Sequence, residues 1–495
     1  KCMGILDHFG EIMLRDQEIP MRLQADAVEQ VEGEFGQRLI FQVKSLIVKE
    51  KLKGTSFEPW LNYPLDIHCM VGEVSLTLSP DQPVLSLSYR LVSKANQYAR
   101  YVRGPWLKVG EGTFGAEKED AILPGVEWLV ADEWSSGTDW FKDPWAMRWM
   151  PHPNKVSAPM MTASHQGTAI TLSWNPNQHS SGWFNYPRQH PQPVFASPNF
   201  IDRQNNHLLG LMIPEAACES QENKVYADPP LELHLDQRVE FDAQIFLSEG
   251  DSLDAMLDWV KRHGMPEPPA PRWPFKEALD RIVTAYTTHY WHEGEGFGVD
   301  QSEPGSGKHR IRPHVPHFVD RYLEMNPGTQ LSQEFKRRVE WCRAQAPEKE
   351  PGMEELLARG KEIVKNQRPD GSFPFDPLGQ HYVKDDFVVA TTFLEPMGIA
   401  QDTALDITIL PVIELLKLAK KTGEASFSTA ARKALDYCIP MQRPEGGDFW
   451  ETPLHSPNLF AAGHAAIAYY LGFQAFGEEV YLKRAIHWIR SLLPF

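Results

Sequence analysis

The sequence lacks several patterns that would assign a protein to a broad class at once. It holds no run of about 18 or more apolar residues, so no transmembrane helix is predicted. Its five cysteines are scattered without a CxxC spacing, which argues against a zinc cluster and excludes a dense disulfide framework, although one disulfide is allowed. The compartment therefore stays open, because secreted, periplasmic and cytoplasmic locations all fit.

Basic residues are scarce relative to acidic ones. The chain has 49 Lys and Arg against 66 Asp and Glu, a formal net charge of −17. Nucleic acids and anionic membranes need a basic face, so neither is expected as a main partner. There is also no GxSxG nucleophile motif and no GK[ST] phosphate loop. Histidines cluster at 289–292 and 309–317 without a tight ligand set, so no metal and no cofactor is expected.

The first half of the chain consists mainly of short segments in which polar and apolar residues alternate. This period of two, rich in Val, Ile, Leu and aromatic residues, predicts strands at 38–52, 73–79, 84–93, 169–174, 207–213 and 238–248. Strands at this density without a long helical pattern predict an antiparallel β-sandwich, which we assign to residues 1–247.

A helix and a proline-rich segment follow the strands. Residues 248–264 have a helical pattern that Asp251 or Ser252 can cap and Gly264 can end. Residues 265–275 are rich in proline, which resists both helix and sheet and makes a semi-rigid spacer. We therefore place a linker at 248–274.

After the linker, apolar residues recur at the spacing of amphipathic helices. Helices are predicted at 275–291, 352–367, 409–423, 427–442, 458–477 and 480–493. Helical hairpins repeated over residues 275–495 predict an α/α toroid, a ring of hairpins whose loops converge at one end. The expected fold is thus multidomain, with an antiparallel β-sandwich followed by a six-hairpin-like toroid that carries the active site.

The most specific pattern in the helical half is a loop sequence that recurs. The segments EGFGVD (295–300), DGSFPFD (370–376) and EGGDFWE (445–451) each begin and end with an acid, and the last two share the lead-in Gln-Arg-Pro. Acid–glycine pairs are also common in ordinary turns. The near-constant spacing nevertheless predicts a repeated unit that delivers Asp300, Asp376 and Glu451 to the same end of the helical ring.

The order of sandwich, linker helix and toroid, together with the segment QRPDGSF (367–373), resembles the six-hairpin glycosidases and related polysaccharide lyases. Many hydrolases of this group place the sandwich first, as this chain does. The resemblance implies a carbohydrate-active enzyme with a carbohydrate substrate. It matches no complete catalytic signature, so it assigns no specific family.

Glycoside hydrolysis needs two carboxyl groups, one to protonate the leaving oxygen and one to activate water or attack the sugar. Asp376 and Glu451 are the first candidates, because each follows a glycine–aromatic turn whose ring and proline neighbours can raise a carboxyl pKa. Asp385 and Asp386 come next, although acids before the apolar run 387–393 can also begin a helix. Asp300 lies in a glycine-rich loop that either covers a substrate or is simply mobile.

Aromatic residues gather in two segments of the β half. Trp134 and Trp140 stand among Ser, Gly and Asp, and Trp183 stands beside Asn and Tyr, so these rings are expected to stack on sugars in a cleft. Trp128 and Trp174 have apolar neighbours and are expected in the core. Further contacts to substrate are assigned to four polar residues: Asp132, Glu133, His292 and Tyr382.

Two other functions stay open on the same residues. A polysaccharide lyase acting on a uronic-acid polymer would use a Tyr or His as its base and an Arg or Asn to neutralise the uronate. The residues that could supply this set are Tyr290, His292, Arg310, Arg312, His314, His381 and Tyr382. A non-catalytic carbohydrate-binding protein would rely on aromatic and amide groups. The surplus of acids in the loops argues mildly against that last alternative.

Overall fold

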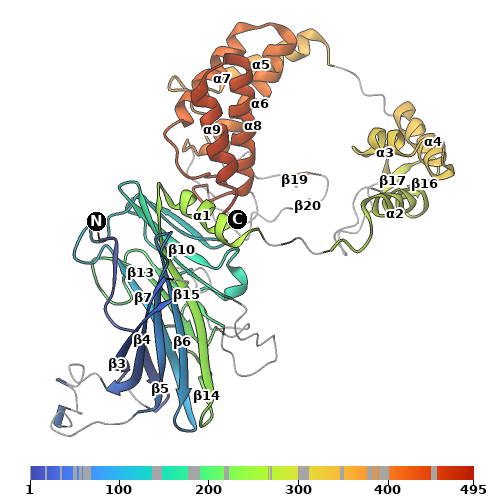
Figure 1. Cartoon of the computed structure of the whole chain (residues 1–495). Helices are drawn as coiled ribbons and strands as arrows, with labels where there is room; N and C mark the ends of the chain where they lie inside the picture. Colours follow the sequence, from blue (N-terminus) through green and yellow to red (C-terminus); the bar gives the residue numbers. More distant parts are fainter. Residues whose placement is uncertain are drawn as a thin grey trace.

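The computed structural model describes most of residues 2–495 (Figure 1). The segments outside the described residues are 17–18, 34–35, 48–52, 55–57, 60–67, 137–147, 177–189, 217–221, 266, 268–269, 299–310, 346–350, 376–382, 385–386, 389–400 and 448–453.

Where the structure describes the first 250 residues, they form an antiparallel sheet of 15 strands. Thirteen of them follow one hydrogen-bonded path in the order β12-β13-β7-β2-β3-β4-β5-β6-β15-β11-β10-β8-β9, while β1 and β14 pair with β7. The strands are β1 (Gly4–Leu6), β2 (Glu11–Leu14), β3 (Met21–Gly33), β4 (Gly36–Ile47), β5 (Met70–Leu78), β6 (Val84–Ser93), β7 (Gln97–Val109), β8 (Asp120–Leu123), β9 (Glu127–Val130), β10 (Met160–His165), β11 (Thr168–Trp174), β12 (Gln192–Ala196), β13 (His207–Ile213), β14 (Leu231–Leu233) and β15 (Arg238–Glu249).

One apolar core joins the two halves of this path. Ile12, Leu107 and Leu209 from one half lie in the same buried cluster as Val74 and Phe241 from the other. The alternation that predicted the strands is visible in the burial of β6, whose residues change between buried and half-buried along its length. The antiparallel, β-rich first half of the chain is therefore confirmed.

Helix α1 (Ser252–His263) follows the last strand and covers part of the sheet. The Asp251 side chain caps the helix by accepting a hydrogen bond from the N–H of Asp254, and the helix ends at Gly264. Leu253 and Met256 pack in one cluster with Phe246 of β15. The predicted helix is observed with the cap and the end residue expected for it, although it begins at Ser252 because residues 248–249 belong to β15.

The rest of the chain is mainly helical. Its helices are α2 (Phe275–Thr288), α3 (Val319–Met325), α4 (Gln330–Gln345), α5 (Met353–Lys365), α6 (Leu405–Thr422), α7 (Ala425–Cys438), α8 (Leu459–Phe476) and α9 (Glu479–Arg490). Short strands also occur among the described residues of this half: β16 (Trp291–His292), β17 (Gly296–Gly298), β18 (Ile311–Arg312), β19 (Val383–Lys384) and β20 (Phe387–Val388). The prediction of a helical second half is confirmed, and α3 and α4 were not predicted.

Among the described helices, α2–α9 gather in two groups and do not close a ring (Figure 1). Helices α2–α4 pack with β17 around Phe297 and Phe335, and helices α5–α9 pack around Leu415, Leu435 and Trp488. The two buried clusters share no residue, because each group satisfies its own apolar faces. The closed toroid is therefore not seen in the part of the chain that the structure describes.

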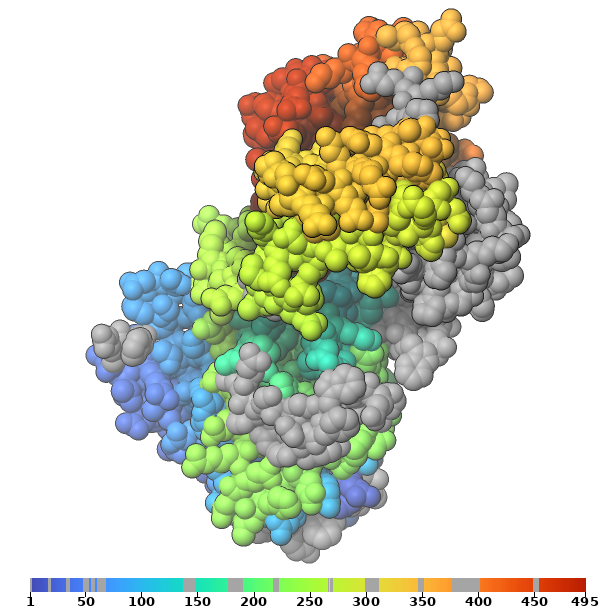
Figure 2. Space-filling view, turned by 90° about the vertical axis from the view of Figure 1, so that its right-hand side faces the viewer, coloured from blue at the N-terminus to red at the C-terminus, as the bar shows by residue number. Residues whose placement is uncertain are grey.

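Helices α5–α9 stand over one end of the sheet, next to α1 (Figures 1 and 2). Leu493, just after α9, packs against the cluster beneath α1, and Arg490 forms an ion pair with Asp254 of α1. The carbonyl of Pro494 accepts a hydrogen bond of 3.1 Å from the Ser157 hydroxyl in the β part. None of the helices described is long and apolar enough to cross a bilayer.

Candidate functional site

Most of the residues predicted to act in catalysis or binding lie outside the described residues. These are Asp300, Asp376, Asp385, Asp386, Glu451, Trp140, Trp183 and Tyr382. Their roles stay predictions. The four that are described are Asp132, Glu133, Trp134 and His292.

Three of the described candidates share the turn 131–136 that follows β9. The side chain of Trp134 is exposed, with 51% of the residue accessible, and Asp132 is exposed beside it. Glu133 is held from within the turn, because its side chain accepts a hydrogen bond of 2.9 Å from the N–H of Val130. The turn is thus a fixed polar edge that presents one exposed indole.

Both tryptophans that were expected in the core are buried. Trp128 is 3% exposed and Trp174 is 7% exposed. His292, by contrast, lies in β16 among helices α2–α4, where its carbonyl accepts a hydrogen bond from the N–H of Glu295. The core expectation is confirmed for both indoles, while His292 belongs to a different part of the fold from Glu133.

The two Gln-Arg-Pro loops occupy equivalent places in two successive helical hairpins. One lies between α5 and α6 and the other between α7 and α8. In the first loop Asp370 accepts hydrogen bonds from the N–H and the hydroxyl of Ser372, at 3.0 and 2.8 Å. Gly371 has φ +99°, and a Cβ there would lie 2.3 Å from the carbonyl of Lys433. The third copy differs, because Gly296–Gly298 form strand β17.

In the second loop Arg443 crosses from the helical part to the β part. Its guanidinium holds Glu133 in a two-point ion pair, at 2.6 and 2.9 Å, and donates to the carbonyl of Trp128 at 2.6 Å. A third carboxylate contact runs to Glu445 within the loop, at 2.8 Å. The arginine is 7% exposed, so its charge is compensated almost entirely by protein groups.

His455 continues this chain of charges to the first hairpin. Its Nδ1 lies 2.7 Å from Glu445, and its Nε2 lies 2.8 Å from Asp402, which precedes α6. The hydrogen bond to Glu445, which outweighs burial, and the contact with Asp402 raise the pKa of His455 to about 9. At neutral pH this imidazole is therefore a cation between two carboxylates.

We call Glu133, Arg443, Glu445, His455 and Asp402 the hairpin-loop network. Its charges alternate in sign from the β part to the loop that precedes α6. Burial acts to raise the pKa of Glu445, but the bonds from His455 and Arg443 outweigh burial and lower it. The hydrogen bond from His455 likewise lowers the pKa of Asp402. Both carboxylates are thus ionised at neutral pH.

A further carboxyl group, Asp406, lies beside this network in the first turn of α6. It is 7% exposed, and its Oδ1 is buried without a hydrogen-bond partner among the described residues. Burial raises the pKa of Asp406 to about 6. Gly446 approaches so closely that a Cβ there would lie 2.6 Å from Asp406 Oδ2. Asp406 is thus a weakly acidic carboxyl group against the second loop.

A small apolar cluster also joins the two loops. Phe375, the last described residue before Asp376, packs with Ala404 and with Leu454, which follows segment 448–453. The N–H of Phe375 also donates a hydrogen bond of 2.7 Å to the carbonyl of Asp402, in the loop segment that precedes α6. The described ends of both acid-bearing loops therefore meet.

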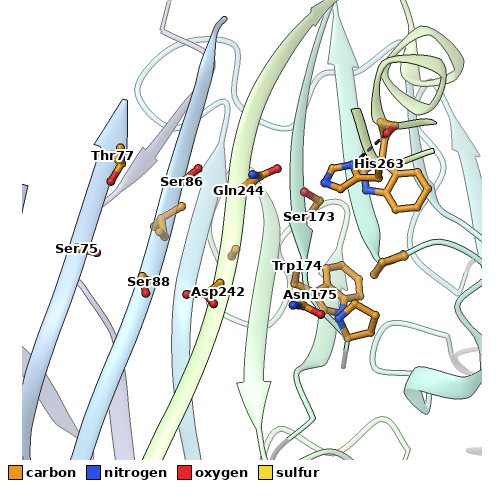
Figure 3. Close-up of a pocket in the computed structure, with 15 residues that line it drawn as sticks. Ser75, Thr77, Ser86, Ser88, Ser173, Trp174, Asn175, Asp242, Gln244 and His263 are labelled. Carbon is orange, nitrogen blue, oxygen red and sulfur yellow. Dashed lines mark hydrogen bonds between the residues drawn. The ribbon is translucent and has the colours of Figure 1, made fainter. Parts of the chain in front are cut away.

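A separate groove of about 540 Å³ runs over β5, β6, β15 and β11 beside the end of α1 (Figure 3). Paired residues from these neighbouring strands line it with short polar side chains: Ser75, Thr77, Ser86, Ser88, Ser173, Asp242 and Gln244. Asp242 is the one carboxylate among the described lining residues, and it accepts a hydrogen bond of 3.1 Å from Arg90. The groove suits a hydroxyl-rich ligand but offers no pair of acids.

Sequence reasoning missed most of the network. Asp402, Asp406 and His455 lie outside the repeated segments, and their proximity depends on how the hairpins pack. The shared Gln-Arg-Pro lead-in was the available signal for Arg443. An arginine that recurs before an acid-rich turn is well placed to form an ion pair with a nearby carboxylate.

Comparison with known proteins gives no family. No family model and no curated protein matches the chain. Solved structures give distant likenesses only. A protein described as an aldose 1-epimerase from Klebsiella pneumoniae is 10% identical, with a TM-score of 0.28, over 52% of this chain and 62% of that one.

Two other likenesses span nearly the whole chain. A bacterial glucoamylase complexed with acarbose is 10% identical, with a TM-score of 0.24, over 98% of this chain and 60% of its own. A polysaccharide lyase is 8% identical, with a TM-score of 0.20, over 99% and 61%. The chain thus spans about three fifths of the length of each of these three proteins. Because these identities and TM-scores are so low, the likenesses carry no argument about function, which has to be argued from the residues of this chain.

Proposed function

We propose that this chain is a carbohydrate-active enzyme that hydrolyses glycosidic bonds at the loop end of helices α5–α9, beside the turn 131–136. The observation that carries the proposal is the joining of the two acid-bearing loops by Asp402, His455 and Glu445. A glycosidase needs carboxyl groups held at a fixed separation, and a bridge between their two loops supplies that constraint.

The catalytic pair is assigned to Asp376 and Glu451, with Asp385, Asp386 and Asp300 as further candidates. One carboxyl group of the pair donates a proton to the leaving oxygen. The other, ionised, activates water or attacks the sugar. Phe375 and Leu454, which flank these loops, are buried apolar residues, and such surroundings favour a protonated acid.

Asp406 is a second candidate for the proton donor. A general acid works best when its pKa lies near the working pH, and the pKa of Asp406 is about 6. Its buried Oδ1 lacks a partner among the described residues, so it can take a hydrogen bond from an added group. Its deep burial favours Asp376 and Glu451 over it for direct contact with substrate.

The remaining members of the site bind or position. The exposed indole of Trp134 offers a face on which a sugar ring can stack, and Trp140, Trp183, Asp132 and Tyr382 stay assigned to substrate contacts. His292 lies in β16 with helices α2–α4, so its assignment to substrate stays a prediction apart from this site. Glu133 is already held by Arg443, so we assign it a positioning role. His455 is a cation at neutral pH and is unsuited to act as the base of a lyase.

The test is a panel of oligo- and polysaccharides assayed with the full chain. New reducing ends without ultraviolet absorbance of an unsaturated uronate indicate hydrolysis, whereas that absorbance indicates a lyase. D376N and E451Q should each lower turnover by about 10²–10⁴-fold with little change in melting temperature. E479Q, an exposed acid at the start of α9, is the matched control. Turnover near the wild-type value in both loop variants would remove Asp376 and Glu451 from the mechanism.

A further inference from the structure

The β part holds a second, smaller pocket whose walls are mainly charged. It has a volume of about 230 Å³ and lies among β2, β3, β7 and the turn after Ile201. This is below the usual range for pockets that take drug-sized ligands. The pocket therefore has room for one small ligand, and we call it the β2–β3–β7 pocket.

Its floor is a row of three charged residues on neighbouring strands. Glu11 of β2 is opposite Arg22 of β3 on one side and opposite Arg103 of β7 on the other. Glu11 is 6% exposed and accepts a hydrogen bond of 2.7 Å from the Tyr101 hydroxyl. The guanidinium of Arg103 lies over the Tyr101 ring, 3.9 Å from its centre. The row is thus rigid and largely buried.

Two donors in this row lack acceptors. The Nε of Arg22 is buried with no hydrogen-bond partner among the described residues. The Nε of Arg103 is likewise buried without a partner among the described residues. Buried donors of a charged group are normally satisfied, since leaving one unpaired costs about 1–3 kcal/mol. Both donors are therefore left for an acceptor from outside the described residues.

His8 adds an acceptor to the same pocket. Its Nε2 lies 3.5 Å from a carboxylate oxygen of Asp7, and its Nδ1 is buried with no partner among the described residues. Burial, the largest effect, lowers the pKa of His8, so the ring is neutral at neutral pH. With the proton on Nε2 toward Asp7, Nδ1 is left to accept a hydrogen bond.

The charges of the pocket balance. Lys108 is neutralised by Asp7 at 2.7 Å, and Glu11 lies between two arginines. Asp202 is held by neutral donors, the indole N–H of Trp106 at 2.9 Å and the side-chain amide of Asn199 at 3.1 Å. Three cations thus face three acids, so the pocket does not select a strongly charged ligand.

From this geometry we propose that the β2–β3–β7 pocket binds one neutral polyhydroxylated ligand, a free monosaccharide or a polyol of that size. Each ligand hydroxyl can accept from Arg22 or Arg103 and donate to His8 or a carboxylate. Hydroxyl groups are the class that uses unpaired donors and acceptors together without adding charge. The site is separate from the hairpin-loop network and goes beyond the proposed hydrolysis.

The test titrates the full chain with D-glucose, D-galactose, D-mannose and sorbitol, using calorimetry and saturation-transfer NMR. We expect saturable binding of at least one of them. R22M, which removes the guanidinium and keeps a long unbranched apolar side chain, should weaken that binding about tenfold or more. R238M removes an exposed arginine of β15 and should bind as the wild type does.

A second variant guards against misfolding. Q204A alters an exposed residue at the rim of the pocket and should weaken binding several-fold. Both R22M and Q204A should keep the circular dichroism spectrum of the wild type, which shows that they fold. Absence of binding, or equal binding by wild type and R22M, would overturn the proposal. Binding of glucuronate or phosphate in place of the neutral ligands would also overturn it. Both variants should retain any hydrolytic activity, which separates this site from the loop site.

Discussion

The pH dependence of stability should reveal the bridge that His455 makes between the two hairpin loops. Its folded pKa is raised from 6.5 to about 9 by Glu445 and Asp402. A group whose folded pKa is raised contributes stability that is complete below the unfolded pKa. That contribution is lost as the pH rises through the folded pKa. The loss should therefore run from about pH 6.5 to about pH 9.

The magnitude follows from the same two values. The difference between 6.5 and about 9 corresponds to at most about 3.4 kcal/mol. The His455 side chain is 52% exposed, so solvent screens its ion pairs and the net effect should be nearer to about 1 kcal/mol. For a helical unit of this size that is a change in melting temperature of roughly 2–4 °C.

The measurement compares the wild type with H455Q across this pH range by thermal unfolding. The wild type should be more stable near pH 6, and the two curves should converge as the pH rises past about 9. H234Q, a change at an exposed turn of the β part, should follow the wild type throughout. If the H455Q curve instead runs parallel to the wild-type curve, the bridge does not stabilise the fold and the loops are held by other contacts.

Three further substitutions test neighbouring features by unfolding experiments. The raised pKa of Asp406 means that its stability contribution is complete below about pH 3.8 and is lost as the pH rises through about 6. D406N should therefore be up to about 3 kcal/mol more stable than wild type near pH 8 in thermal unfolding, with no gain near pH 4. R443M should cost about 3 kcal/mol because it removes the buried cation that pairs with both Glu133 and Glu445. A loss below about 1 kcal/mol would contradict that role. G371A should destabilise by more than about 1 kcal/mol through its positive φ and its contact with a backbone carbonyl, whereas the helical G463A should be neutral or stabilising.

The regular elements could be predicted because their apolar periods survive in the fold. Strands β6 and β13 have the bounds predicted for them, β6 from its alternation, and α1 has both of its expected caps. Helix α4 was missed although Phe335, Val339 and Cys342 are spaced as one buried helical face. Its many Arg, Gln and Glu residues hide that face in a sequence read for hydrophobic runs.

The candidate site could be predicted only in part, because loops have no period to read. The turn 131–136 was chosen for its tryptophans, and its Glu133 does contact the helical part, through Arg443. Asp402 and His455 lie 53 residues apart in the sequence and meet only because two hairpins pack side by side. No local sequence pattern indicates a contact between residues so far apart in the chain, so this bridge could be found only in the structure.

The repeated arginine explains how one loop sequence serves two purposes. In the first hairpin Arg368 stays within its own loop, bonded to Ser372 and to the carbonyl of Gln401. In the second, Arg443 takes the equivalent position and reaches Glu133 of the β part. The same residue type therefore closes one loop and docks the other. Because His455 joins the loops, fixing the second against the β part also fixes the first. The described parts of both loops are thereby tied to the turn that carries Trp134. Our proposal of a two-carboxylate enzyme with a sugar-stacking wall requires such a connection between the loops and this turn.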